Sequence, residues 1–371
     1  MIYLDNAATS YPKPKCVIDK INFCLKNSCG NPGRSGHRLS LRASEEIYDV
    51  REKIANFLHF SYPERVVFTY NATYALNIAI KAFVCRKCHI ITSDFEHNSV
   101  IRPLEAMKKR YDIEYSCFDT DNLLESLYKN LREDTKGIIC SVASNVTGKI
   151  IPLSILSKFA RENSLFLIID ASQAVGHIDI DLTKNPCDAL CAPGHKSLFG
   201  VQGSGFVIFS DKTRRDTIIE GGSGAESESP AMPILLPEGY EGGTLGTPAI
   251  ASLGAGIDYI SRIGIENISA HLHHLTDELY ERLVDIEGIK IYGAENGIVS
   301  FNYKNISSSE IARDLDEYGI CVRGGLHCAP SAHKKIGSIN QGTVRASFSL
   351  FNRVRDVDAL YRAMKMIVNK K

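Results

Sequence analysis

Residues 65–83 read "RVVFTYNATYALNIAIKAF", and this stretch contains the pattern that decides the fold. Its first six residues are typical of a strand, and residues 72–83 have the apolar spacing of a helix. The alternation recurs in "CHIITSD" and "SVIRPLEAMKKR", then in "GIICSVAS" and "LSILSKFARENS", and "LFLIID" begins again with a strand. Strands and helices that alternate from about residue 15 to residue 250 predict an α/β domain with a mostly parallel sheet.

The later part of the chain has a different pattern. Residues 220–248 are rich in Gly, Pro and Ser and predict a long loop or an irregular hairpin. Helical patterns follow at residues 249–264 and 268–286, and then "IVSFNY", a helical "SSEIARDLDEYG", "ICVRGG" and "GTVRASFS" predict a smaller α+β domain. We therefore expect a large α/β domain over residues 13–255 and a small domain over residues 256–371, with residues 1–12 packed alongside.

Composition excludes several classes of function. The 371 residues include 43 Lys plus Arg and 43 Asp plus Glu, so the formal net charge is zero and nothing favours binding to nucleic acid or to an anionic membrane. The longest apolar runs are too short to span a bilayer, and the first residues do not resemble a signal peptide. Eleven scattered cysteines favour reduced thiols and a cytoplasmic location over a disulfide framework.

Two short motifs contain metal-ligand residue types, but neither predicts a metal site. "CRKC" at residues 85–88 has no second pair of cysteines or suitably placed histidines, and "HLHH" at residues 271–274 lies in a polar helical stretch. We expect no metal.

Polar residues at three predicted strand ends are candidates for chemistry, because ligands of open α/β sheets bind beyond the carboxyl ends of the strands. In "FTYNATYALN", the N–H groups of Ala72 and Thr73 and the Thr73 hydroxyl would form a phosphate site at a helix N-terminus. Asn and Thr before a helix are also ordinary caps, so both interpretations stay open.

Asp170 and Lys196 follow the next two predicted strands. We expect a helix after Asp170, which makes it either an N-cap or a buried carboxylate paired with a cationic ring nitrogen. Lys196, in "CAPGHKSLFG", is either a surface charge or a buried neutral amine that forms a Schiff base. A phosphate-type turn, a strand-end Asp and a Gly-flanked Lys, in this order, predict an enzyme that uses pyridoxal 5′-phosphate (PLP).

The sequence as a whole resembles the class V aminotransferase-fold enzymes, and among them the cysteine desulfurases and selenocysteine lyases. The motifs that carry this resemblance are "YLDNAATS", "NPGRSGHRLS", "FTYNATYALN", "EHNSV", "SNVTG", "DASQAVGHIDID", "GHK", "GTP", "VRGGLHCAP" and "GTVRAS". It implies the PLP-dependent transferase (aspartate aminotransferase-like) fold. It also implies a homodimer that converts L-cysteine to L-alanine, with L-selenocysteine as an alternative substrate.

The resemblance also implies roles for residues that match these motifs. Lys196 would form the Schiff base, His97 would stack on the cofactor ring, and Asp170 would pair with the ring nitrogen. The remaining cofactor-binding residues would be Asn145 and Gln173 at the phenolic oxygen, Ala72, Thr73 and His195 at the phosphate, and Thr247 at the phosphate of the partner subunit. The substrate would contact Arg345 through its carboxylate, and also Asn6, Ala7 and Arg323.

Cys328 matches the catalytic cysteine of the group whose motif ends in His-Cys-Ala. It would attack the sulfur of the bound substrate and so become a persulfide, which a protein acceptor would then receive. Arg323 or His327 would favour its thiolate through positive charge. We expect the Gly-rich turn that carries Cys328 to be mobile enough to approach the substrate.

The sequence departs from the family at two places, and alternatives stay open. Pro193 stands where the family often has a serine that contacts the phosphate, and residues 220–248 are richer in Gly than in better-known members. Another PLP enzyme on this fold, an aminotransferase or a β-lyase, is one alternative. A non-catalytic PLP-binding sulfur carrier is the other.

Overall fold

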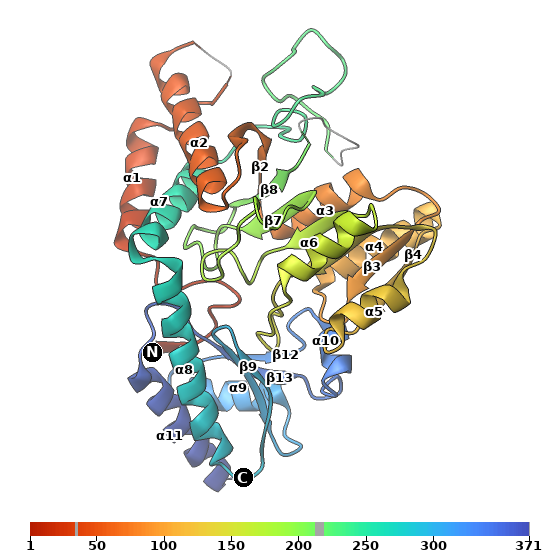
Figure 1. Ribbon diagram of the computed structural model, residues 1–371. Coiled ribbons are helices and arrows are strands. Elements are labelled where there is room, and N and C mark those ends of the chain that lie inside the picture. The colour runs from red at the N-terminus through yellow and green to blue at the C-terminus, as the bar shows by residue number, and fades with distance from the viewer. Residues whose placement is uncertain (34–35, 212–218, 371) are drawn as a thin grey trace.

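A seven-stranded sheet forms the centre of the computed structural model, which describes residues 1–33, 36–211 and 219–370 (Figure 1). The strands lie in the order β2 (Val66–Thr69), β8 (Gly205–Phe209), β7 (Ala189–Pro193), β6 (Phe166–Asp170), β5 (Thr135–Ser141), β3 (His89–Ser93) and β4 (Glu114–Phe118). Strand β8 pairs antiparallel with β2 and β7, and the other pairings in this sheet are parallel. The predicted α/β class with a mostly parallel sheet is confirmed.

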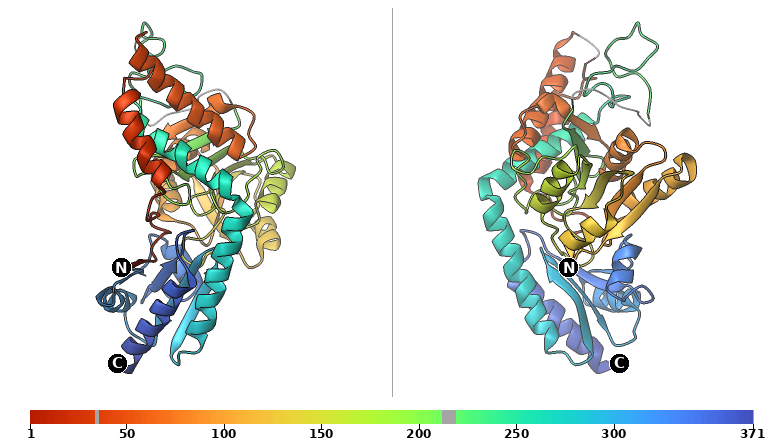
Figure 2. Two further views of the ribbon diagram at one scale, coloured as in Figure 1. Left: turned by 90° about the vertical axis from the view of Figure 1, so that its left-hand side faces the viewer. Right: turned by 45° about the vertical axis from the view of Figure 1, so that its right-hand side comes forward.

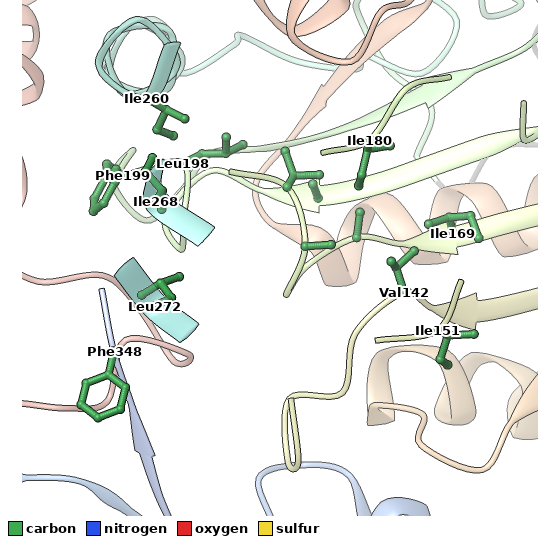
Figure 3. Close-up of a cluster of buried hydrophobic side chains, with 14 of the residues drawn as sticks. Val142, Ile151, Ile169, Ile180, Leu198, Phe199, Ile260, Ile268, Leu272 and Phe348 are labelled. Carbon is green, nitrogen blue, oxygen red and sulfur yellow. The ribbon is translucent and has the colours of Figure 1, made fainter. Parts of the chain in front are cut away.

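Helices cover both faces of this sheet, which explains why its inner strands are apolar on both sides. On one face, α3 (Ala72–Phe83) and α4 (Asn98–Tyr111) pack on the strands in one apolar cluster. On the other face, α5 (Leu123–Asn130), α6 (Leu153–Glu162) and α7 (Thr247–Ile263) share a second cluster with α2 (Arg38–Phe57). Figure 3 shows part of this second cluster, in which Val142 and Ile169 from the sheet region lie near Ile151 and Ile180.

The predicted alternation fails at two places. The chain forms two helices here, α1 (Lys15–Asn27) and α2, and the described residues between them contain no strand. These helices pack against α7 instead of joining the sheet. The sequence analysis did not predict strand β4 or helix α5. Strand β4 is an edge strand with exposed positions, so it lacks a strong apolar signal.

The remaining elements form a smaller α+β part in the lower half of Figure 1. Its sheet has the order β12 (Arg323–Gly325), β13 (Thr343–Ser347), β10 (Ile298–Tyr303) and β9 (Ile289–Glu295). The other elements of this part are β1 (Ile2–Tyr3), α8 (Ile265–Val284), α9 (Ser308–Glu317), β11 (Ile320–Cys321), α10 (Pro330–Lys335) and α11 (Val354–Lys370). A short 3₁₀ turn, η1 (Pro63–Arg65), precedes β2 in the large part.

Helices α7 and α8 follow each other along the side of the molecule and connect the two parts (Figure 2). The expected domain boundary, between residues 255 and 256, lies inside α7. The division into residues 13–255 and 256–371, with 1–12 alongside, therefore stays a proposal. Strand β1 pairs with β11, so the first residues of the chain lie beside the small part.

The segment before α7 is a long loop, as predicted, because residues 219–246 contain no helix or strand. All eleven cysteines lie in the described residues and are unpaired, which confirms the expectation of free thiols. In the described part of the chain, no helix has both the length and the apolar character needed to cross a bilayer.

Candidate active site

The carboxyl ends of β2, β3, β5, β6 and β7 meet around a cavity of about 200 Å³. Parallel strands bring these ends to one edge of the sheet, where the loops after them supply the side chains. Among the residues predicted to be functional, those that line this cavity are Ala7, Ala72, Thr73, His97, Asn145, Asp170, Gln173, His195, Lys196, Arg323 and Arg345. Asn6, Thr247 and Cys328 do not line it.

Lys196 has the environment of a nucleophilic amine. It follows β7 and lines the cavity, and burial lowers its pKa to about 8, although the charge of Asp170 opposes that shift. An amine with this pKa is neutral in a large fraction of molecules near pH 8, which is the form that attacks a carbonyl carbon. The interpretation of Lys196 as a surface charge is therefore wrong.

Asp170 is a buried carboxylate at the end of β6. Its Oδ1 accepts a hydrogen bond of 2.9 Å from the Ser172 amide, which closes a turn. The expected helix after Asp170 is absent, because residues 171–177 form turns. The N-cap interpretation is therefore wrong, and a buried carboxylate on the cavity wall needs a cationic partner there.

His97 and Ser99 form a chain of hydrogen bonds that reaches Thr73. The Nδ1 atom of His97 lies 2.9 Å from Ser99 Oγ and 3.1 Å from the Ser99 amide, which donates to it. Ser99 Oγ in turn lies 2.8 Å from Thr73 Oγ1. Burial lowers the pKa of His97 to about 4, so its ring is neutral and Nδ1 is the acceptor of the amide. Sequence reasoning missed Ser99, because a serine two residues after a histidine gives no distinctive signal.

The start of helix α3 offers free donors to the cavity. Asn71 is the N-cap, and its side chain accepts a hydrogen bond of 3.1 Å from the Tyr74 amide. The amides of Ala72 and Thr73 lie in the first turn, where a helix provides no backbone partner. The cap interpretation is thus correct for Asn71, whereas the phosphate site at the next two amides stays a prediction, which their free N–H groups suit.

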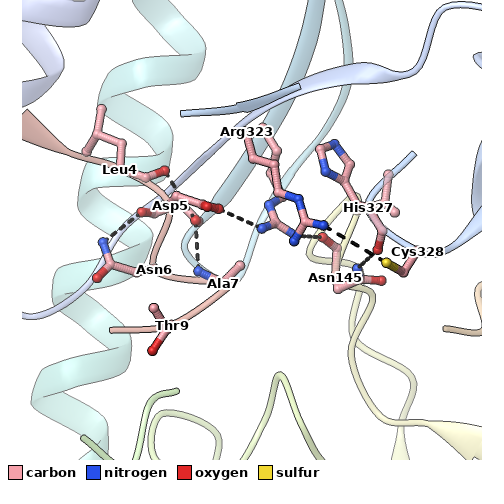
Figure 4. A network of polar contacts seen from close by, with 12 residues as sticks. Leu4, Asp5, Asn6, Ala7, Thr9, Asn145, Arg323, His327 and Cys328 are labelled. Carbon is pink, nitrogen blue, oxygen red and sulfur yellow. Dashed lines mark hydrogen bonds and ion pairs between the residues drawn. The ribbon is translucent and has the colours of Figure 1, made fainter. Parts of the chain in front are cut away.

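Buried contacts connect the small part to this cavity (Figure 4). The Arg345 guanidinium donates to Asp5 Oδ1 at 2.8 Å and to the Asn145 carbonyl at 2.8 Å, while its Nε is buried without a partner among the described residues. Gln173 donates to the Ala7 carbonyl at 2.9 Å. An unpartnered Arg345 N–H on a cavity wall is a ready donor for a carboxylate ligand.

Asn6 lies behind the cavity wall. Its side chain donates to the Ser347 carbonyl at 3.0 Å and to the Asn352 side chain at 3.2 Å. The structure therefore places Asn6 as a support for the wall that Ala7 lines, and the expected contact between Asn6 and substrate stays a proposal.

Glu96 is a further carboxyl group that the sequence analysis did not identify. It is fully buried, and it accepts hydrogen bonds from Ser93 Oγ and from the amide and hydroxyl of Ser141, the latter two at 3.0 Å. Burial raises its pKa to about 7. Ser141 lines the cavity, so Glu96 stabilises the loop ends from behind the site.

Cys328 lies on a neighbouring hollow of about 890 Å³ that shares Thr73, His97 and Ser99 with the cavity. The thiol is exposed, and Arg323 Nη2 lies 4.0 Å from its Sγ. Burial lowers the pKa of His327 to about 2, so His327 is neutral and supplies no positive charge. Of the two expected cationic neighbours of Cys328, only Arg323 is charged.

Two carbonyl groups of the turn that carries Cys328 accept hydrogen bonds from the large part, and the expected mobility of this turn stays a prediction. His327 and Cys328 both have left-handed backbones, with φ values of 49° and 58°, a conformation that costs on the order of 1 kcal/mol for each non-glycine residue. Their carbonyl groups accept hydrogen bonds of 2.7 Å from the Asn145 side chain and the Asn98 amide. Such a conformation persists where the surroundings support it, which these two hydrogen bonds do.

Thr247 is 3% exposed in the first turn of α7, which puts its side chain inside its own chain. Thr244, three residues earlier, is exposed. A side chain that reaches across an interface has to be exposed in the single chain, so Thr244 fits a contact with the partner's phosphate better than the predicted Thr247 does. The motif "NPGRSGHRLS" includes Arg34 and Ser35, which lie outside the described residues.

The donor set of the cavity fits PLP. A poised lysine amine suits its aldehyde, the buried Asp170 carboxylate suits a protonated ring nitrogen, and the α3 amides suit its phosphate. Pro193 ends β7 and lines the cavity without a hydroxyl to offer. In the residues that the structure describes, no group of three His, Cys, Asp or Glu side chains is arranged to hold a metal ion.

Comparison with known proteins gives consistent results. The family model described as "Aminotransferase class-V" matches residues 2–360. A probable cysteine desulfurase of Methanothermobacter thermautotrophicus is 32% identical over 99% of this chain and 94% of its own. The apo structure of a cysteine desulfurase from Thermococcus onnurineus superposes with a TM-score of 0.91 and 29% identity over 100% of this chain and 95% of its own. A cysteine desulfurase from Escherichia coli, 23% identical over 99% of this chain and 94% of its own, has the same fold with a TM-score of 0.90.

Proposed function

The chain belongs to the class-V aminotransferase family and is a PLP-dependent cysteine desulfurase, and we propose that the residues around the 200 Å³ cavity and Cys328 carry its reaction. The observation that carries this proposal is the meeting of Lys196, Asp170 and His97 in one cavity, with Cys328 on the adjoining hollow. Lys196, Asp170 and His97 follow or end strands β7, β6 and β3, and Cys328 belongs to the small part.

Each residue has a role that its environment suits. Lys196 would hold the aldehyde carbon of PLP, and Asp170 would pair with the ring nitrogen. Asn145 and Gln173 would bind the phenolic oxygen, while Ala72, Thr73 and His195 would bind the phosphate. His97, neutral and on the cavity wall, would stack on the ring and move protons. PLP, when bound, withdraws electrons from the amino acid joined to it.

The substrate is held from the side of the small part. Arg345 binds the carboxylate of L-cysteine through its unpartnered Nε, while Asp5 and the Asn145 carbonyl hold its two terminal nitrogens. Ala7 and Arg323 complete the pocket, since both line the cavity. Asp5 and Asn145 keep the fork in one orientation before substrate arrives.

The sulfur leaves through Cys328. Its thiolate, beside Arg323, attacks the substrate sulfur as the carbon–sulfur bond breaks, and a proton goes to the carbon. The products are L-alanine and a persulfide on Cys328. Because the thiol lies exposed on the larger hollow, a protein acceptor can reach it there. The unpaired cysteines agree with the cytoplasmic location that we propose.

Incubation of the purified PLP-loaded protein with L-cysteine and a thiol reductant should give L-alanine and sulfide in equal amounts. The reason is that a persulfide on Cys328 returns its outer sulfur to the reductant. We propose L-selenocysteine as a second substrate, which should give L-alanine and selenide. Quantification of alanine, pyruvate and sulfide tests both statements, and formation of pyruvate in place of alanine would show a β-lyase.

We also propose a homodimer in which the segment 244–247 reaches the partner's phosphate. The protein should sediment with twice the mass of one chain at assay concentration, because the site would otherwise lack one phosphate contact. The PLP affinities of Thr244→Ala and Thr247→Ala, measured separately, identify the contact. Because Thr244 is exposed, we expect Thr244→Ala to weaken PLP binding roughly tenfold through loss of that hydrogen bond. An active monomer in sedimentation would contradict the proposal.

A further inference from the structure

Helix α10 begins two residues after Cys328 and is seated on the loops that form the active site. Its fully buried Ala332, and Ala329 just before the helix, pack in a small apolar cluster with Phe95 and Val146. Phe95 follows β3 and precedes His97, whereas Val146 follows β5 and Asn145. The segment that carries Cys328 therefore packs against the loops that carry His97 and Asn145.

Ion pairs attach the C-terminal end of α10 to loops of the large sheet. Lys335, its last residue, lies 3.3 Å from Asp94 Oδ2 and 2.8 Å from Asp121 Oδ2, and it also forms an ion pair with Asp119. Asp94 follows β3, and the other two carboxylates follow β4. One ammonium group thus joins the end of the Cys328 segment to two loops of the large sheet.

This network is more than a pair of surface charges. Lys335 is 24% exposed and Asp94 18%, so water screens their interaction only in part. Hydrogen bonds, first of all from Lys335, lower the pKa of Asp119 to about 2, so it is charged at every assay pH. Without the Lys335 ammonium, the three carboxylates would repel each other. Lys149 forms an ion pair with Asp121, so it would neutralise that carboxylate only.

We propose that Lys335 is a positioning residue that holds the Cys328 turn in place against the cofactor cavity. The inference rests on the proposed function, in which Cys328 receives the sulfur. The left-handed pair His327–Cys328 needs support from its surroundings, which two hydrogen bonds from the loops after β3 and β5 provide. Helix α10 packs on the same two loops, and Lys335 binds it to them at the end of the helix opposite to Cys328.

The test compares Lys335→Met with Lys335→Arg and with Lys334→Met in the PLP-loaded enzyme. Methionine keeps the length of the side chain without its charge, arginine restores the charge, and Lys334 is the exposed neighbour. In Lys335→Met, kcat for alanine formation should fall about tenfold, which corresponds to about 1.4 kcal/mol of barrier. KM for L-cysteine should change less than twofold, because Arg345 and Lys196 are untouched. The other two variants should stay within twofold of wild type.

Hydrogen exchange supplies a readout that does not depend on activity. In Lys335→Met, the amides of Asn98 and Ala329, which bond to the Cys328 and Leu326 carbonyls, should exchange at least tenfold faster, and in Lys334→Met they should not. Unchanged exchange, or faster exchange with wild-type kcat, overturns the positioning role. Full activity of a Cys328→Ala variant would instead refute the proposed function, and the exchange result would still decide whether Lys335 holds the turn.

Discussion

Replacement of Cys328 by alanine should lower the rate of alanine formation from L-cysteine by on the order of 10³-fold, as expected when a covalent nucleophile is removed. PLP binding should be unchanged, because Cys328 lies on the adjoining hollow and not on the wall of the cavity. The absorbance of the bound cofactor and its change upon addition of L-cysteine should therefore match those of wild type. Product analysis and absorbance spectra measure the two effects on one sample.

Cys85 supplies the matched control for this substitution. It is also exposed and lines the same hollow, but it follows α3 and does not belong to the turn that carries Cys328. Cys85→Ala should retain wild-type rates. Undiminished alanine and sulfide from Cys328→Ala would replace the persulfide mechanism with that of a β-lyase. Residual selenide release from L-selenocysteine by this variant would not contradict the persulfide mechanism, because the weaker carbon–selenium bond breaks with less assistance.

Replacement of Lys196 by alanine should abolish the yellow colour of the protein and reduce activity on the order of 10⁴-fold or more, because the covalent anchor of the cofactor is lost. Borohydride reduction of the wild-type protein, followed by peptide mapping, should locate the reduced cofactor on Lys196. Lys13 is the natural competitor, since burial also lowers its pKa to about 8 and its Nζ donates to the His195 carbonyl. Reduced cofactor on Lys13 would show that the assignment of Lys196 is wrong.

The functional residues at the strand ends could be predicted from the sequence, because they follow strong apolar runs. Asp170 and Lys196 each end such a run, and a parallel sheet places both at one edge. The helix predicted after Asp170 is wrong, because the carboxylate closes a turn with the Ser172 amide that no propensity rule identifies. Local pattern thus located the residue and misjudged the backbone beyond it.

Residues that act through partners far away in the sequence could not be identified from the sequence alone. Asp5 and Arg345 are 340 positions apart, and only the folded chain brings the carboxylate to the guanidinium. Glu96 gave no signal, because its importance lies in complete burial and in the serines that surround it. The contacts of the Cys328 turn gave no signal either, because its hydrogen-bond donors come from the loops after β3 and β5.

The pairing of the first strand with late ones affects how the protein is made. Ile2 pairs with Ile320, Asn6 donates to the Ser347 carbonyl, and Asp5 bonds to Arg345. A nascent polypeptide on the ribosome can build the large sheet early, but its first residues have no place to dock until those around positions 320–347 have been translated. Contacts between such remote positions close slowly. The cofactor cavity is thus completed late in synthesis, and an incomplete nascent chain that still lacks Arg345 cannot clamp an amino acid.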